Sequence, residues 1–271
     1  MGFFKKLLPF ALAGVSLQGL AVSVDFPQAD IDSGKALKEI GQTALNNALA
    51  RLDGSSKCTK ENVRRRKEWR TLPGEERKAY VKAVECLMEQ PNVYENVTGP
   101  KIYVWTFEEK LRTLCGYTGA FPYWEWGLDA GGVEKSPLFD GSETSLGSNG
   151  AKVNSSNNFF PGGSGGGCVT HGPFVNYTVN FGPNTAKDPL AYNPRCLKRD
   201  LNTQICAQWA SIKNTTETIL ESPDIALFQA NLQGDFRWPE ARKWGFAVHG
   251  GGHFSIGKSR VLDRRAGCAD I

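Results

Sequence analysis

Two histidines near the end of the 271-residue chain are spaced as metal ligands can be. His249 and His253 stand four residues apart in Val248–Gly257 (VHGGGHFSIG), and the chain holds three histidines in all. Positions i and i+4 share one face of a helix, so both imidazoles could reach one ion. The three glycines between them disfavour that helix by roughly 1 kcal/mol each relative to alanine. The residues alone therefore leave two interpretations open: a metal site, or a pair of hydrogen-bonded structural histidines. Imidazole ligands suit copper, zinc, iron and nickel alike, so they do not identify the metal.

The same stretch also matches a phosphate-binding loop. Gly252–Ser259 spells G-x-x-x-x-G-K-S, in which backbone N–H groups and a following helix hold phosphates. Such a loop needs a parallel sheet around it, and the twelve residues after Ser259 offer no further strand. We interpret the match as chance.

The first residues predict a secreted protein. A basic start (MGFFKK) precedes an apolar run (LLPFALAGVSLQGLAV) that ends near the small residues Ala21 and Ser23, as in a cleaved signal peptide over residues 1–23. A proline and polar residues interrupt the run, and no other stretch approaches the ~20 apolar residues of a membrane span. We expect no membrane association after cleavage.

The cysteines and glycosylation sequons fit an oxidising, extracellular compartment. None of the cysteine spacings is that of a zinc site, so we expect disulfides with one cysteine left over, in a pairing that spacing does not determine. Four Asn-x-Ser/Thr sequons predict a glycoprotein. The cysteines are Cys58, Cys86, Cys115, Cys168, Cys196, Cys206 and Cys268, and the sequons begin at Asn96, Asn154, Asn176 and Asn214.

The charge argues against a nucleic-acid-binding protein. A formal net charge of +4 is mild and dispersed along the chain. We interpret the basic run Arg64–Lys67 (RRRK) as the solvated face of a helix.

Apolar residues at helical spacing predict four helices in the first part of the chain. The first is an amphipathic N-terminal helix within residues 24–57, capped by Ser33 and ended by Gly54, and the second covers Lys60–Trp69. The third follows the cap Thr71, with Glu75 and Glu76 in its first turn and Pro91 beyond its end. The fourth begins at Ile102 and is ended by Gly116. The last two carry apolar stripes that we expect to pack on each other: Tyr80, Val81, Val84, Leu87 and Met88, and Val104, Phe107, Leu111 and Leu114.

The middle of the chain, Gly127–Pro194, is rich in Gly, Asn, Ser and Pro, and predicts long loops tied by cysteines. A helix returns after the cap Ser222, with Pro223 in its first turn. Pro122–Trp126 (PYWEW) is interpreted as aromatic packing. The fold class predicted is mainly α, with long loops and short strands.

Six segments resemble the fungal tyrosinase and catechol oxidase family, the type-3 copper proteins, in that family's order. They are Arg66–Leu87, Tyr103–Trp126, Ser136–Ser142, Cys168–Pro183, Asn193–Leu201 and Val248–Gly257. The resemblance implies a tyrosinase-type four-helix bundle that holds two copper ions, each bound by three histidines, and that oxidises phenols or o-diphenols to quinones with dioxygen. It places His249 and His253 as the first two ligands of the second copper. By the same resemblance, Gly250, which follows the first of them, favours o-diphenols as substrates.

This chain departs from the family pattern at the other ligands. No histidine lies between Met1 and Thr170, and Pro100 stands where the family has a Trp-His-Arg run before a helix. The Leu-His-His run expected downstream of residue 257 is not found. His171 lies in a stretch that the family does not use for copper, and we interpret it as a loop residue. We therefore expect an incomplete bundle and at most one weakly held copper.

Two explanations of the missing histidines stay open, genuine loss and an error in the gene model. Gly257–Ser259 can be encoded with an intron start, so the atypical tail 258–271 would be translated intron, and Cys268 would then be the unpaired cysteine. The copper-binding domain would span residues 58–257, in part.

The preferred hypothesis is a secreted copper-dependent oxidoreductase of the tyrosinase or catechol oxidase type, with a small phenol and dioxygen as substrates and with doubtful activity in this chain. The alternative is a non-catalytic secreted glycoprotein, or binding module, derived from that family.

Overall fold

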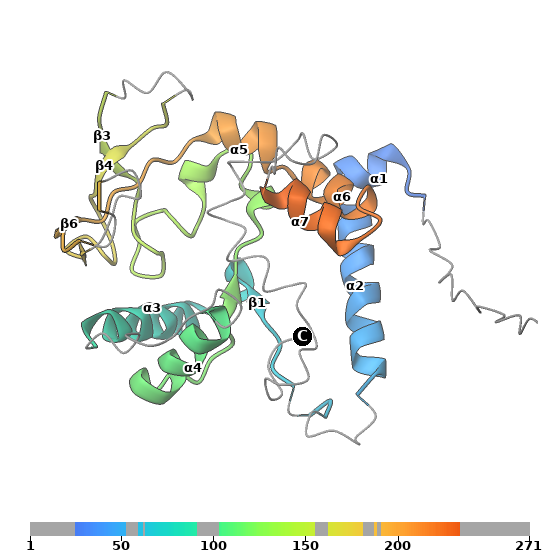
Figure 1. Ribbon diagram of the computed structural model, residues 1–271, viewed down its shortest axis with the longest axis horizontal. Helices are drawn as coiled ribbons and strands as arrows, with labels where there is room; N and C mark the ends of the chain where they lie inside the picture. The colour runs from blue at the N-terminus through green and yellow to red at the C-terminus, as the bar shows by residue number, and fades with distance from the viewer. Residues whose placement is uncertain are drawn as a thin grey trace, which may run out of the picture.

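The computed structural model describes residues 25–52, 59–61, 63–90, 103–154, 162–180, 187–188 and 191–233. The chain is mainly helical (Figure 1), as predicted. Its helices are α1 (Gln28–Asp32), α2 (Lys35–Ala50), α3 (Gly74–Glu89), α4 (Tyr103–Cys115), α5 (Thr203–Trp209), α6 (Ile212–Leu220) and α7 (Ile225–Gln233), with 3-10 turns η1 (Trp69–Thr71), η2 (Trp126–Leu128) and η3 (Val133–Lys135). Among the described helices, none has the length and apolar character that crossing a membrane requires.

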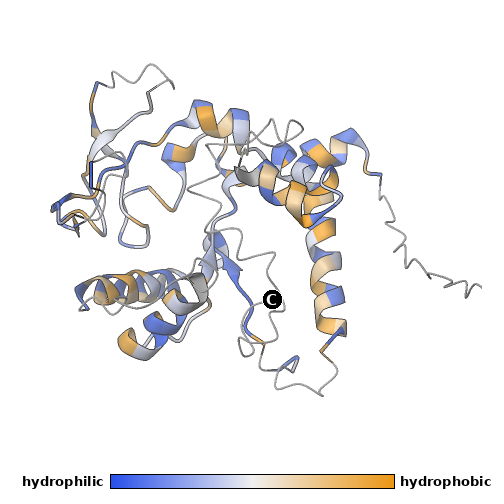
Figure 2. Cartoon of the chain, viewed as in Figure 1, coloured by the Kyte–Doolittle hydropathy of each residue, from blue (hydrophilic) through white to orange (hydrophobic). Residues whose placement is uncertain are grey.

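Short strands join the loops in pairs. β1 (Lys67–Glu68) runs parallel to β2 (Pro122–Tyr123); β3 (Gly150–Lys152) is antiparallel to β4 (Gly166–Val169), and β5 (Thr178–Val179) to β6 (Arg195–Cys196). Figure 2 shows the hydrophobic residues gathered mostly in the helices, α2, α6 and α7 among them.

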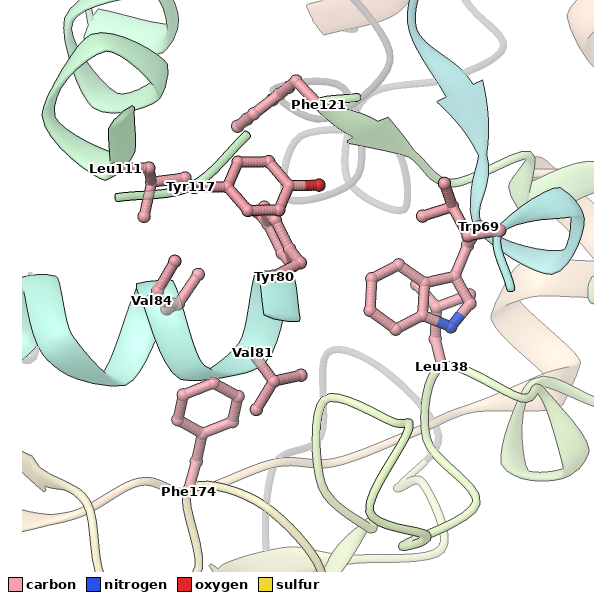
Figure 3. Close-up of a cluster of buried hydrophobic side chains, with 11 residues drawn as sticks. Trp69, Tyr80, Val81, Val84, Leu111, Tyr117, Phe121, Leu138 and Phe174 are labelled. Atoms are coloured by element: carbon pink, nitrogen blue, oxygen red, sulfur yellow. The ribbon is translucent and has the colours of Figure 1, made fainter. Parts of the chain in front are cut away.

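The main core lies where α3 and α4 pack together, as their apolar stripes predicted. Tyr80, Val81 and Val84 of α3 are buried, and Leu111 of α4 is fully buried. Around them Figure 3 shows side chains converging from the loops on both sides of the pair. The buried cluster is Trp69, Leu72, Tyr80, Val81, Ala83, Val84, Leu111, Tyr117, Phe121, Leu138 and Phe174.

Two members of the predicted stripes are exposed instead. Met88 is 40% exposed and Leu114 is 42% exposed. Both lie in the last turn of their helix, beyond the aromatic cluster, so the helical period continues after the core has ended. Leu87 and Phe107 do pack against the core, as predicted.

Helix starts were predicted less well than helix ends. Thr71 belongs to η1, where its hydroxyl donates to the carbonyl of Glu68 (2.7 Å), and α3 begins after Pro73 without a side-chain cap. The proline fixes φ at a value suited to helix entry, which removes the need for the cap. Gly116 ends α4 with φ = 66°, as predicted.

The N-terminal helix breaks at the predicted cap. Ser33 ends α1, and Gly34 then starts α2 in a left-handed conformation (φ = 79°). A Cβ on Gly34 would lie 2.7 Å from Ile212 Cγ2, so glycine is required both by the backbone and by the close approach of α6. Arg51, not Gly54, follows the last residue of α2.

The helix predicted over Lys60–Trp69 is wrong, and the solvent exposure predicted for its basic run holds for Arg65 and Lys67 but not for the partly buried Arg64 and Arg66. The segment is extended and leads into β1, with exposed and partly buried residues alternating at the strand period. Arg64 Nη1 lies 3.2 Å from carboxylate oxygens of both Glu108 and Glu109, and the Arg66 guanidinium lies 4.9 Å from the Phe121 ring centroid. Carboxylates of α4 and an aromatic ring in the loop after it thus contact these two arginines, which are partly buried.

The C-terminal helices were predicted only in part. α7 is present, but its cap is Asp224, whose Oδ1 accepts from the Leu227 N–H (2.8 Å), rather than Ser222. Neither α5 nor α6 was predicted. Thr216 and Thr218, both buried in α6, donate to the carbonyls four residues earlier, which satisfies their hydroxyls inside the protein.

The long loops predicted over Gly127–Pro194 are confirmed, with 3-10 turns and short strands within them. Their glycines admit polar partners: the N–H groups of Gly163 and Gly165 donate to the Asp200 carboxylate at 3.1 and 2.9 Å. A Cβ at either position would collide with a neighbouring side chain. Glycine is thus needed at these two positions because neighbouring side chains approach the backbone closely.

Two disulfides tie the described chain. Cys86–Cys115 joins the ends of α3 and α4, and Cys168–Cys196 joins the loops at β4 and β6. Cys206 of α5 is a free thiol, while Cys58 and Cys268 lie outside the described residues.

Removing the Cys86–Cys115 disulfide by alanine substitution at both positions is expected to lower the free energy of unfolding by about 3 kcal/mol, because the bond restricts the unfolded chain over a separation of 29 residues. Denaturant titration measures the change. The control Cys206→Ala removes a thiol that makes no disulfide, and should shift stability much less. A double variant that unfolds at the parent's midpoint would contradict the prediction.

Candidate metal centre and its supporting scaffold

The predicted ligands His249 and His253 lie outside the described residues, as do the phosphate-loop match Gly252–Ser259 and most of the stretch around Pro100. Their pairing at one ion therefore stays a prediction. What the structure describes is the packing of the rest of the chain, above all of the pair α3–α4.

The described histidine, His171, stands apart from other metal-binding side chains. It is exposed; its N–H donates to Ser148 Oγ (3.0 Å), and its ring Nδ1 lies 2.9 Å from Thr170 Oγ1. Within the described ranges, no three His, Cys, Asp or Glu residues converge as a metal site requires. These residues do not by themselves fit a copper centre, and His171 is a loop residue as interpreted.

A buried carboxylate anchors α4 to the segments beside it. Glu108 is 1% exposed, and its Oε1 accepts from Arg112 Nε (3.0 Å), Arg112 Nη2 (2.7 Å) and Arg64 Nη1 (3.2 Å). Arg112 also donates to the carbonyls of Tyr117 (3.3 Å) and Gly119 (2.8 Å). Two guanidiniums around one carboxylate offset its desolvation, so the loop after α4 is fixed relative to the helix. Sequence analysis missed Glu108, although Arg112 four residues later was a signal for it.

A second buried carboxylate joins the loops on the other side of β1. Asp129 accepts from the guanidinium of Arg70, from Trp124 Nε1 (2.7 Å) and from Ser136 Oγ (2.7 Å). Arg70 is itself held by Glu68 (2.7 Å). The network fixes the aromatic segment Pro122–Trp126 through the indole nitrogen of Trp124.

That aromatic segment is packing, as interpreted. The Trp124 ring meets Phe139 edge to face at 5.3 Å, and Trp126 is buried, with its Nε1 donating to Thr215 Oγ1 of α6 (3.1 Å). Trp126 thereby links η2 to α6.

Two tyrosines of the core stay neutral because they are buried. Burial raises the pKa of Tyr117 to about 12, and its hydroxyl donates to the Ala120 carbonyl (2.6 Å). Burial also raises the pKa of Tyr80, well above its ordinary value. Both phenols are therefore structural groups of the core.

Comparison with known proteins gives one consistent result. The family model described as the common central domain of tyrosinase matches residues 101–268. The chain is 39% identical to Oxidase hkm6 of Aspergillus hancockii over 177 residues, which cover 58% of this chain and 60% of that protein. It is 32% identical to Tyrosinase P of Aspergillus terreus over 251 residues, which cover 74% of this chain and 68% of that protein. The chain thus spans about two thirds, or less, of these curated relatives.

A solved structure agrees with them. A polyphenol oxidase from Thermothelomyces thermophila superposes with a TM-score of 0.61 at 29% identity, over 86% of this chain and 72% of that one.

Asp129→Ala is expected to lower the free energy of unfolding by about 3 kcal/mol, because it leaves three donors without their acceptor, one of them the buried Ser136 hydroxyl. Glu143→Ala is the matched control: this carboxylate pairs with Lys78 at 2.9 Å but is 83% exposed, so its loss should lower stability far less. Urea titration of both variants measures the difference, and equal losses would show that the Asp129 network is not needed.

Stability should fall with rising pH above about 10, where tyrosines of the unfolded chain ionise. Because the pKa of Tyr117 in the folded chain is about 12, the folded state keeps a proton that the unfolded state loses, and the free energy of unfolding decreases over this interval. Tyr117→Phe should make that decrease shallower, while its effect at pH 7 reports only the lost hydrogen bond. Unfolding curves between pH 7 and 12 test this; identical slopes would refute it.

Proposed function

Because the chain belongs to the tyrosinase family, we propose that it is a secreted protein of the copper oxidoreductase type in which His249 and His253 hold a single copper ion. The observation that carries this proposal is the family match, whose range 101–268 contains both histidines. Two neutral imidazoles four residues apart are suitable copper ligands. The glycines between them leave the ion open to a small ligand.

Copper, when bound, would supply the redox chemistry by which this family oxidises phenols or o-diphenols with dioxygen. The chain's own part is to hold the ion and to leave room for a small aromatic beside Gly250. The family's two copper ions take six histidines, whereas the 271 residues contain three. We therefore expect weak copper binding and little quinone formation from this chain.

Secretion is part of the same proposal. The basic start and apolar run of residues 1–23 support it. So do the bonds Cys86–Cys115 and Cys168–Cys196, because disulfides persist in oxidising compartments.

The second candidate is a non-catalytic secreted glycoprotein. It is favoured by the described polar clusters, in which Glu108, Asp129 and Arg199 all serve packing. The Arg199 guanidinium, for example, stacks on Phe139 and donates to the carbonyls of Leu146, Gly147 and Ser148.

Copper titration of the secreted protein separates the two candidates. We expect one Cu²⁺ per chain, with an electron paramagnetic resonance signal showing nitrogen ligands, and at least about tenfold weaker binding in His249→Ala and in His253→Ala. His171→Ala is the matched control and should bind as the parent does. Equal binding by all four proteins would favour the non-catalytic candidate.

Activity is tested on the same samples. We expect the parent protein, given catechol and added copper, to consume oxygen at a rate close to that of His249→Ala. Rapid quinone formation, lost in both ligand variants, would show that the chain supplies more copper ligands than its histidines.

A further inference from the structure

The four sequons are not equivalent in the fold, and two of them can be compared directly. Asn176 and Asn214 are described together with the hydroxyl residues of their sequons, Thr178 and Thr216. Asn96 lies outside the described residues, as does Ser156 of the sequon at Asn154. A folded protein can carry a sugar only on a side-chain amide that reaches solvent and has room around it for a bulky group.

Asn176 meets both requirements. It ends the turn at residues 173–176, directly before β5, and both Asn176 and Thr178 are exposed. Within the described part of the chain, the Asn176 amide makes no side-chain hydrogen bond. The backbone of Thr178 is extended and pairs with Cys196 of β6, so the sequon is held at the surface by a strand pair and the Cys168–Cys196 disulfide.

Asn214 is partly buried and lacks the room. It lies in the first turn of α6, where its Nδ2 donates to the Gln208 carbonyl (3.1 Å) and its Oδ1 accepts from the hydroxyl of Ser211, the helix cap. Thr216 is fully buried, and its hydroxyl donates to the Ile212 carbonyl (2.9 Å). A sugar on Asn214 Nδ2 would enter the junction of α5 and α6 and displace this capping.

We infer that Asn176 carries an N-linked glycan and that Asn214 does not. The inference rests on the proposed secretion, because the sugar donor, a lipid-pyrophosphate-linked oligosaccharide, is met in the secretory pathway. Asn176 Nδ2 forms a bond to the anomeric carbon of the first N-acetylglucosamine and gives up a proton. The bond from that carbon to the pyrophosphate oxygen breaks, and the lipid pyrophosphate leaves.

A groove beside Asn176 provides a surface for the first sugars. It has a volume of about 520 Å³ and lies between the end of α3 and residues 172–178. Two of its apolar side chains, Met88 and Val175, are 40% and 39% exposed. Glu85 and Glu89 of α3 line the same groove, so the apolar face of a sugar can cover the first two side chains while its hydroxyls donate to the carboxylates. The glycan would screen an apolar surface that solvent now meets.

Glycan mapping of the secreted protein tests the inference. The full chain is secreted from yeast in two versions, one with its own residues 1–23 and one with a yeast secretion leader in their place. Peptide N-glycosidase in heavy-oxygen water then labels each occupied asparagine, and peptide mass spectrometry locates the label. We expect label at Asn176 and none at Asn214.

Variants make the assignment specific. Asn176→Gln and Thr178→Ala should each lose one glycan, whereas Thr178→Ser retains the hydroxyl and should keep it. Asn214→Gln should leave the glycan pattern unchanged. Failure of the first version alone to reach the medium counts against the proposed signal peptide and leaves the second version to decide the glycan. An unlabelled Asn176, or a labelled Asn214, in secreted protein overturns the inference.

Discussion

The described fold depends on the contacts of one ring, that of Tyr80. It meets Trp69 at 5.9 Å, Tyr117 at 5.6 Å and Phe121 at 5.9 Å, each edge to face. These partners come from η1 and from the loop after α4, so a single side chain of α3 joins the segments on both sides of the pair. Such contacts contribute about 0.5–1.5 kcal/mol each beyond the area that they bury. Around this centre the two carboxylates Glu108 and Asp129 hold the surrounding loops, and loops rather than further helices complete the core.

Much of this core could be predicted from the sequence because it follows a local rule. The apolar residues of α3 and α4 recur at the helical period, and Gly116 follows the last of them. The basic run Arg64–Lys67 could not be placed in the same way. Its partner Glu108 lies 44 residues further along from Arg64, and Asp129 lies 59 residues from Arg70. Burial of a charge depends on a distant group of opposite sign, which no local spacing reveals.

The candidate metal centre shows the same division between local and distant information. The spacing of His249 and His253 predicted a pair of ligands, and the resemblance to a family supplied the metal. Among the described residues, no three His, Cys, Asp or Glu side chains converge as a metal site requires, so that part of the chain adds no second candidate centre. Local sequence was also poor at helix starts: Pro73 stands before α3 where the cap was expected at Thr71, and Gly34 stands before α2 where the cap was expected at Ser33.

The pairing of the described disulfides has a consequence for how the chain acquires its fold. Cys86 bonds to Cys115 and Cys168 bonds to Cys196, and in each case the partner is the next cysteine along the sequence. The two bonds neither cross nor enclose one another. During vectorial synthesis, each bond can close as soon as its second thiol emerges, before any later cysteine is available to compete. The order of synthesis thus favours each of these pairings over one with a later cysteine, and leaves the earlier Cys58 as the thiol that can compete for Cys86.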